Sequence, residues 1–381
     1  MSAYLDHASG WPLSDEVQDA MARWTRHVGS PMSLHEQARA PADAIEDARD
    51  EVAALTGWAP EAVIFTAGAT EARNLAIKGP LGAAHRVAPV IAADPLAHAS
   101  TLAVARSATR HAGALRLAGV DGQGHPAPGD VTRLAAGADV VVITHGQAEV
   151  GTIRDAAMLV ARIRDAAPGA VIVLDAEETA GLVPLDAGLG ADLVVIGGRS
   201  LGGPAWAGAL LVRPGIHLHP LIEGGVEEGG KRGGPHDVPA IAALAMAARL
   251  ARPAMRDRVA RMRAVAHRLA NGLLSVPGTR LNGPPVDERL PGHVQVSTAG
   301  VTGEAVALAM ATRGVAVSPG SACAFGAGKA SPVLEAMGLG DDAARSAVLL
   351  TAGPGTTDAD ADSAIAAFAA SVAALRAMAP G

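Results

Sequence analysis

Six short apolar runs alternate with longer helix-like stretches, and this alternation constrains the fold of the chain more than any other feature. The runs are apolar at consecutive positions, as in strands whose two faces are both covered in a parallel sheet. Strand–helix alternation at this spacing predicts a doubly wound α/β domain with functional sites at the carboxyl ends of its strands. The runs are AVIFTAG (62–68), APVIAAD (88–94), DVVVITH (139–145), AVIVLDA (170–176), DLVVIGG (192–198) and GALLVR (208–213).

A second pattern replaces the first in the last third of the chain. The segment 223–237 is too rich in glycine and charge for a protein core, and an alanine- and arginine-rich helix is predicted from Pro239 to about Ser275. From the run GHVQVST onward the pattern becomes a mixture of strands and helices. We therefore predict a large α/β domain over 15–255 and a smaller α+β domain built from 1–14 and 256–381.

Composition excludes several classes of function. With 381 residues, 49% of them hydrophobic, the chain can bury a large core. A net charge of −7, no basic block and few aromatic residues argue against a nucleic-acid ligand. No signal peptide or membrane-spanning run is recognisable, so we expect a cytoplasmic protein that does not bind membranes. Cys323 is the single cysteine, and the histidines of HLH (217–219) have no third ligand in sight, so neither a disulfide framework nor a metal site is expected.

Three stretches could carry chemistry. After the first strand, Gly68 to Glu71 opens a helix whose N–H groups, with the Thr70 hydroxyl, suit an anion; an ordinary capped helix is the alternative. Asp175 ends a strand and could hold a protonated ring nitrogen. The alternative is that it simply caps the next helix. Cys323 lies among small residues in SPGSACAFGAGKASP, a setting typical of an exposed loop and a reactive thiol, with Lys329 nearby.

In their order along the chain, these motifs resemble those of the cysteine desulfurases, which are fold-type I enzymes that depend on pyridoxal phosphate. YLDHAS resembles the family's Tyr-Leu-Asp-Asn-(Asn/Ala)-Ala-Thr, and GSPMSLH its Gly-Asn-Pro-Ser-Ser-Leu-His. FTAGATEARN is similar to Phe-Thr-Ser-Gly-Ala-Thr-Glu-Ser-Asn-Asn. AEVGTI, DAEETAG and SPGSAC match three further family motifs, so the resemblance runs from residue 4 to past 350. It implies a large domain with a mostly parallel seven-stranded sheet flanked by helices, and a smaller α+β domain.

The resemblance fails at the position that binds the cofactor covalently. The family's Ser-Ala-His-Lys turn falls on Gly197, Gly198, Arg199 and Ser200. Its lysine forms the Schiff base with pyridoxal phosphate, and the hydroxyl of Ser200 cannot form an imine. None of the three lysines of the chain offers an obvious substitute. These lysines are Lys78, at a helix end, Lys231, in the glycine-rich segment, and Lys329.

Other positions depart from the family as well, each with the loss of a contact that the resemblance would imply. Ala97, with His98 beside it, replaces the family's histidine that stacks on the cofactor ring, and Glu178 replaces the glutamine that hydrogen-bonds the cofactor phenolate. Ala148 replaces a substrate-contacting asparagine, and Leu349 replaces the arginine that clamps the substrate carboxylate. Pro235 replaces the threonine that reaches the phosphate bound by the partner subunit. The remnant pocket would comprise Ala69, Thr70, Asp175, Glu178 and Arg199.

We therefore predict a desulfurase-like protein that has lost autonomous desulfurase activity and holds no covalent cofactor. In the first hypothesis it is a homodimer with an accessory role in sulfur or iron–sulfur metabolism, and Cys323 exchanges persulfide sulfur with a donor or acceptor protein. In the second, the pocket binds pyridoxal or pyridoxamine phosphate without a covalent bond, or another anion, with Arg199 as phosphate partner; residual desulfurase activity also stays open. An inactive subunit paired with an active paralogue is disfavoured. Such a subunit would donate a hydrogen bond to the cofactor phosphate of its partner, and Pro235 has no donor for that contact.

Overall fold

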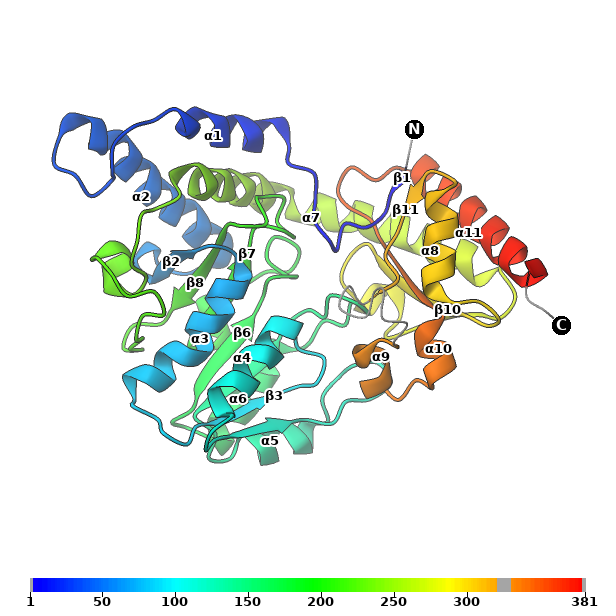
Figure 1. The fold of residues 1–381 in the computed structure, drawn as a ribbon, viewed down its shortest axis with the longest axis horizontal. Helices are drawn as coiled ribbons and strands as arrows, with labels where there is room; N and C mark the ends of the chain where they lie inside the picture. The colour runs from blue at the N-terminus through cyan, green and yellow to red at the C-terminus, as the bar shows by residue number, and fades with distance from the viewer. Residues whose placement is uncertain (1–2, 321–329, 379–381) are drawn as a thin grey trace.

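The computed structural model describes residues 3–320 and 330–378 and divides them into a large and a small lobe (Figure 1). The large lobe is built on a seven-stranded sheet with the order β2-β8-β7-β6-β5-β3-β4. All of its strands are parallel except β8, which runs antiparallel to both β2 and β7. The strands are β2 Val63–Thr66, β3 Val90–Ala93, β4 Ala114–Leu117, β5 Val140–Thr144, β6 Val171–Asp175, β7 Leu193–Gly197 and β8 Gly208–Val212.

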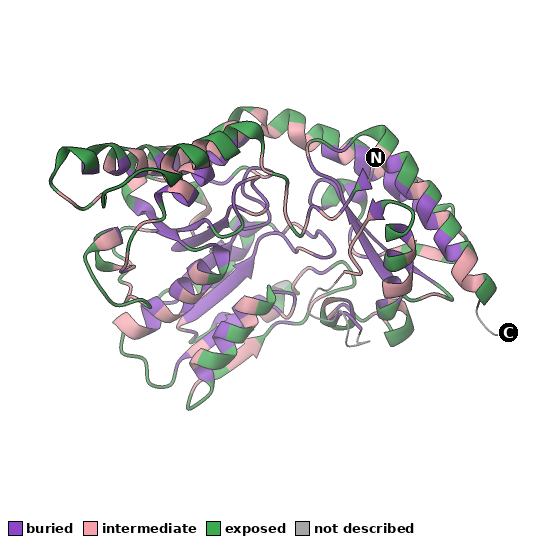
Figure 2. Cartoon of the chain, turned by 45° about the horizontal axis from the view of Figure 1, so that its top comes forward, coloured by how far each residue is buried: buried purple, intermediate pink, exposed green. Residues whose placement is uncertain are grey.

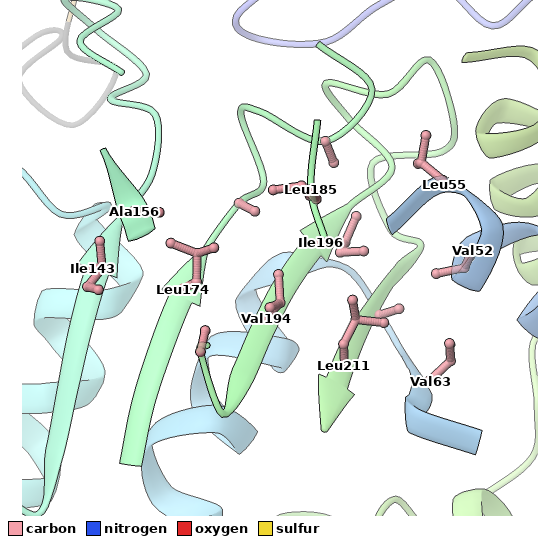
Figure 3. Packing of buried hydrophobic residues seen from close by; sticks show 14 of the residues in the cluster. Val52, Leu55, Val63, Ile143, Ala156, Leu174, Leu185, Val194, Ile196 and Leu211 are labelled. Atoms are coloured by element: carbon pink, nitrogen blue, oxygen red, sulfur yellow. The ribbon is translucent and has the colours of Figure 1, made fainter. Parts of the chain in front are cut away.

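Helices cover both faces of this sheet, which explains the continuous apolar runs. Along β7, Leu193 and Val195 pack with α3 and α4 on one face, while Val194 and Ile196 face the cluster of α2, α6 and α7 on the other. Figure 3 shows the second of these packing layers. The helices are α1 Asp15–Thr25, α2 Glu36–Thr56, α3 Ala69–Ala83, α4 Ala99–Thr109, α5 Pro128–Ala135, α6 Ala156–Ala166 and α7 Val238–Leu274, with short 3-10 turns at Pro60–Ala62, Ala187–Leu189 and Glu227–Gly230.

The small lobe combines the last third of the chain with its N-terminal segment. An antiparallel sheet of order β12-β10-β9 forms its centre, and β1 pairs in parallel with β11 beside it. Ala3 and Leu5 share a buried cluster with Val294, Val306 and Phe368. The elements are β1 Ala3–Tyr4, β9 Thr279–Leu281, β10 His293–Thr298, β11 Val315–Ala316, β12 Ala347–Thr351, α8 Gly303–Ala311, α9 Pro332–Ala336, α10 Asp341–Arg345 and α11 Asp358–Met378, with a 3-10 turn at Val286–Glu288.

Helix α7 joins the two lobes, since its first half packs on α1 and α2 and its second half on α11 (Figure 1). By length and composition alone, α7 and α11 could each cross a membrane. Both nevertheless belong to the protein core along one face: Leu244 and Leu269 of α7 and Phe368 of α11 are almost fully buried. Figure 2 shows buried and exposed residues along the C-terminal helix α11, and α7 likewise has buried and exposed positions along its length. This is the pattern of amphipathic core helices.

Candidate functional site

The carboxyl ends of β2, β6 and β7 meet at one edge of the large sheet, where the sequence predicts the site. These three strands run in the same direction, so the residues that follow them converge. Asp175 ends β6, Gly197 ends β7, and α3 begins at Ala69 shortly after β2. The turn 198–201 continues from β7 across the same edge. The structure therefore brings together Ala69, Asp175, Glu178 and Arg199 of the predicted pocket, with Ser200 beside them.

Gly197 has to be small because two elements approach it closely. A Cβ added to Gly197 would lie 2.9 Å from Cγ of Glu177 and 3.2 Å from Cβ of Ala69. The end of β7 is thereby packed between the start of α3 and the segment that follows β6. The side chain of Glu177 therefore lies against the end of β7, next to the turn that carries Arg199 and Ser200.

Ser200, at the position of the family's cofactor lysine, is a buried residue with 4% of its surface exposed. Its hydroxyl donates a hydrogen bond to the backbone carbonyl of Glu177. The side chain is therefore tied to the backbone. At this position the chain offers a partnered hydroxyl and no amine.

Arg199 does not extend towards a free anion site but is held by the protein itself. Its guanidinium forms salt bridges with the carboxylates of Glu177, at 3.1 Å, and Glu178. It also donates to the backbone carbonyl of Ala8. Arg199 thus links the turn after β7 both to the segment after β6 and to the N-terminal segment.

A second arginine, Arg73 on α3, belongs to the same site. Its Nε lies 2.7 Å from Oδ2 of Asp175, and its Nη2 lies 3.1 Å from Oδ1 of Asp175 and 2.5 Å from Oε2 of Glu177. The sequence reasoning missed Arg73. The signal was available, because Arg73 falls on the same helical face as the small residues Ala69 and Ala76, where a charged side chain is buried and must be paired.

These contacts form one network, which we call the arginine–carboxylate cluster: Arg73, Asp175, Glu177, Glu178 and Arg199. Glu177 is its centre, since it bridges the two guanidinium groups. Burial favours the neutral form of Glu177, but Arg199 and Arg73 outweigh burial and lower its pKa to about 2. For Glu178, burial prevails over the attraction of Arg199 and raises the pKa. With two guanidinium groups and three carboxyl groups, the cluster has no surplus of positive charge.

The residues at this edge do not fit the pyridoxal phosphate that the family resemblance implies. The carboxylate of Asp175, which would hold the protonated ring nitrogen, already has Arg73 as a two-point partner. The cavity beside it, between Arg73, Asp175, Glu178 and Ala148, measures about 20 Å³. That volume has room for about one water molecule. No amine stands at residue 200, so neither covalent attachment nor the ring pocket is provided.

The remaining predicted residues are not members of this cluster, and two of them lie outside the described part of the chain. Thr70 is exposed in the first turn of α3, and His98, next to the buried Ala97, accepts a hydrogen bond from the backbone N–H of Ser100. Leu349 is buried in β12 opposite Gln295. Cys323 and Lys329, on which the persulfide hypothesis rests, lie outside the described residues.

Metal-ligating side chains do not gather within the described ranges. Neither 3–320 nor 330–378 holds a group of three His, Cys, Asp or Glu side chains that could bind an ion. His217 and His219, the pair singled out in the sequence, are both exposed.

Comparison with known proteins agrees with the arrangement of the fold. The sequence pattern of the family described as aminotransferase class-V matches residues 3–350. A protein named cysteine desulfurase IscS 1 from Archaeoglobus fulgidus is 31% identical over 381 aligned residues, covering 99% of this chain and 98% of its own length. An IscS-like cysteine desulfurase from Mycobacterium tuberculosis is 33% identical, covering 95% of this chain and 94% of its own.

Solved structures share the same fold at lower identity. A NifS-like protein superposes with a TM-score of 0.91 at 24% identity, covering 98% of this chain and all of its own. An apo structure of a cysteine desulfurase from Thermococcus onnurineus superposes with a TM-score of 0.86 at 20% identity, covering 98% of this chain and 95% of its own. Both lobes are therefore arranged as in these proteins.

Proposed function

Because the chain belongs to the aminotransferase class-V family and is a homologue of cysteine desulfurases, we propose that it is a desulfurase-like protein that does not itself desulfurate cysteine. The family's chemistry depends on pyridoxal phosphate attached to a lysine. The observation that carries the proposal is the side chain at that position, the buried hydroxyl of Ser200, which donates to the carbonyl of Glu177. A hydroxyl there supports neither the covalent link nor the proton transfers that a lysine amine provides.

The absorbance spectrum of the purified protein, with and without added pyridoxal phosphate, tests this proposal. We expect no absorbance band of bound cofactor, no borohydride-stable adduct on any peptide, and no sulfide released from cysteine. A cysteine desulfurase relative, treated in parallel, should give all three signals. An adduct on Lys78, Lys231 or Lys329, or sulfide release above the blank, would refute the proposal.

The role that we propose is an accessory one in sulfur or iron–sulfur metabolism, with Cys323 as a carrier of sulfur. In this step the Cys323 thiolate attacks the terminal sulfur of a donor persulfide, a new S–S bond forms on Cys323, and the donor leaves as a thiolate. No external oxidant or reductant is needed, because the terminal sulfur keeps its oxidation state. The support is the match of SPGSAC to the catalytic-cysteine motif of the family.

Mass spectrometry after incubation with a persulfide donor tests the carrier role. We expect a mass increase of one sulfur atom on the Cys323 peptide, and its transfer to a small thiol acceptor. The Cys323→Ser variant is the control for labelling elsewhere. If Cys323 remains unmodified while the donor is consumed by other thiols in the mixture, the carrier role is wrong.

The assembly and location of the protein belong to the same proposal. We propose a homodimer in the cytoplasm that meets a sulfur-donating or sulfur-accepting protein and neither membranes nor nucleic acid. Sedimentation equilibrium should give twice the mass of the 381-residue chain. A monomer at micromolar concentration would contradict the dimer.

The alternative function, a non-covalently held pyridoxal or pyridoxamine phosphate or another anion, has less support. Arg199, its intended phosphate partner, is already paired with Glu177 and Glu178. A phosphate ester released when the purified protein is denatured would favour this alternative.

A further inference from the structure

Arg73 is placed where the family pattern has no charge. In FTAGATEARN, Arg73 stands where the family stretch Phe-Thr-Ser-Gly-Ala-Thr-Glu-Ser-Asn-Asn has its first asparagine. Two residues separate the end of β2 at the sheet edge from the start of α3, so the second turn of α3 places residue 73 against the end of β6. The Arg73 residue is only 3% exposed. A buried guanidinium is stable only when its charge and its N–H groups are satisfied.

Asp175 satisfies Arg73 in the two-point geometry that suits a guanidinium and a carboxylate. Nε and Nη2 of Arg73 reach the two oxygens of Asp175 at 2.7 and 3.1 Å, and Nη2 also reaches Glu177 at 2.5 Å. Both side chains of the Arg73–Asp175 pair are 4% exposed. Although burial alone would lower the pKa of Arg73, Asp175 and Glu177 raise it above its ordinary value, so its charge is permanent.

A protonated ring nitrogen and the Arg73 guanidinium would compete for the same carboxylate. Two cations in contact with one buried carboxylate repel each other, and a like charge at this distance disfavours the protonated ring. The guanidinium also lines the cavity of about 20 Å³ that remains beside Asp175. Charge and volume therefore act in the same direction.

We infer that Arg73 is the residue that excludes a pyridoxal-type ring from this fold, by serving as the permanent counter-ion of Asp175, and that the loss of the lysine at residue 200 is a second and separate barrier. Asp175 is thus retained as the partner of Arg73. The inference rests on the proposed absence of cofactor chemistry and adds to it the residue that decides the specificity of the pocket.

The two barriers predict a particular double-mutant cycle. Ser200→Lys restores an amine but leaves the ring site occupied by the guanidinium. Arg73→Asn frees Asp175 but provides no amine. Only Ser200→Lys combined with Arg73→Asn removes both barriers.

The experiment measures loading of pyridoxal phosphate in the wild type, the two single variants and the double variant. After incubation and gel filtration, bound cofactor is read from the absorbance spectrum, and a borohydride-stable adduct is mapped by mass spectrometry. We expect the double variant to carry an adduct on residue 200 at a concentration of pyridoxal phosphate about tenfold or more below that needed by Ser200→Lys, since one adjacent charge shifts an ionisation by about one to three pKa units.

Two further variants keep the result interpretable. Arg73→Gln with Ser200→Lys retains amide hydrogen bonding to Asp175 without the charge, in case the asparagine variant does not fold. Arg199→Asn with Ser200→Lys removes the other arginine of the cluster, which does not contact Asp175, and should load no better than Ser200→Lys alone. Thermal melting of each variant establishes that it is folded.

The outcomes separate this inference from the proposed function. If Ser200→Lys alone loads as readily as the folded double variant, or if the Arg199 variant loads as well as the Arg73 variant, Arg73 is not the excluding residue. If the wild type itself forms an adduct or releases sulfide from cysteine, the proposed function fails instead.

Discussion

Arg199 exemplifies a charged residue whose place in the interior depends on its partners. Its guanidinium faces Glu177 and Glu178, and all three side chains are largely buried. Removing one member of a buried ion pair costs more than the pair contributes, because the remaining charge loses both its partner and its hydration. Without Arg199, Glu178 would lose its salt-bridge partner, and Glu177 would keep its salt bridge with Arg73.

We therefore expect Arg199→Gln to lower the free energy of unfolding by about 3–5 kcal/mol. Arg268→Gln is the matched control: Arg268 binds Asp362 through two contacts of 2.6 and 2.7 Å, but at the surface. The control should change stability little, because water replaces the lost contacts. Urea denaturation followed by circular dichroism measures both variants, and equal losses would contradict the assigned role of the buried cluster.

At the scale of elements, the contact between α7 and α11 joins the long helix to the small lobe. Gly272, near the C-terminal end of α7, lets α11 approach closely. A Cβ at Gly272 would lie 2.4–2.7 Å from three side-chain carbons of Ile365. The glycine is therefore required by the packing of two helices and not by a turn.

Gly272→Ala should lower the free energy of unfolding by about 1–3 kcal/mol, since overpacking outweighs the better helix propensity of alanine. Gly129→Ala in α5 is the comparison, because a Cβ there has no heavy atom within 4 Å in the described part of the chain. That variant should be neutral or more stable by up to about 1 kcal/mol. Denaturant titration measures the difference, and a stabilised Gly272→Ala protein would refute the close helix contact.

At the scale of the whole molecule, His293 connects the lobes. It lies in β10 of the small lobe, and its Nε2 is 3.2 Å from the backbone carbonyl of Ala148 in the large lobe. Burial first, and the neighbouring Arg289 in addition, lower its pKa to about 4. In the folded protein, His293 is neutral at pH 7.

This lowered pKa predicts an acid-dependent difference between the wild type and His293→Gln. Between pH 6.5 and pH 4 the unfolded chain binds a proton at His293 that the folded chain does not, so the contribution of the neutral imidazole is complete above pH 6.5 and decreases as the pH falls to 4. Relative to the variant, the wild type should lose about 3 kcal/mol across this interval. Denaturation at several pH values measures it; a constant difference would contradict the buried neutral histidine.

Much of the large lobe could be predicted from local patterns. All six apolar runs become strands, and the long helix predicted from Pro239 to about Ser275 is α7 at Val238–Leu274. The strand that the runs missed is β4, an edge strand that pairs only with β3 and whose ends, Ala114 and Leu117, are exposed. The other edge strand, β2, is buried along its whole length and was recognised, whereas β4 is partly exposed. Because β4 is not covered on both faces, it lacks the continuous apolar run of the other strands.

The direction of β8 could likewise not be predicted from the pattern of apolar residues. Its residues are as buried and apolar as those of its neighbours. Both faces of the sheet are covered by helices whichever way the strand runs, so its apolar residues do not reveal its direction. Only the pairing with β2 and β7 shows that it runs antiparallel.

The sequence by itself determined that the chain has an α/β fold with its site at the strand ends, and that residue 200 has no amine. Both follow from local properties: the spacing of apolar residues and the identity of one side chain. Only the tertiary structure decided that Asp175 is the partner of Arg73, 102 residues away, and that Arg199 is paired internally. A buried charge pairs with the opposite charge that the fold brings close to it. The distance between two residues in space cannot be read from their separation along the sequence.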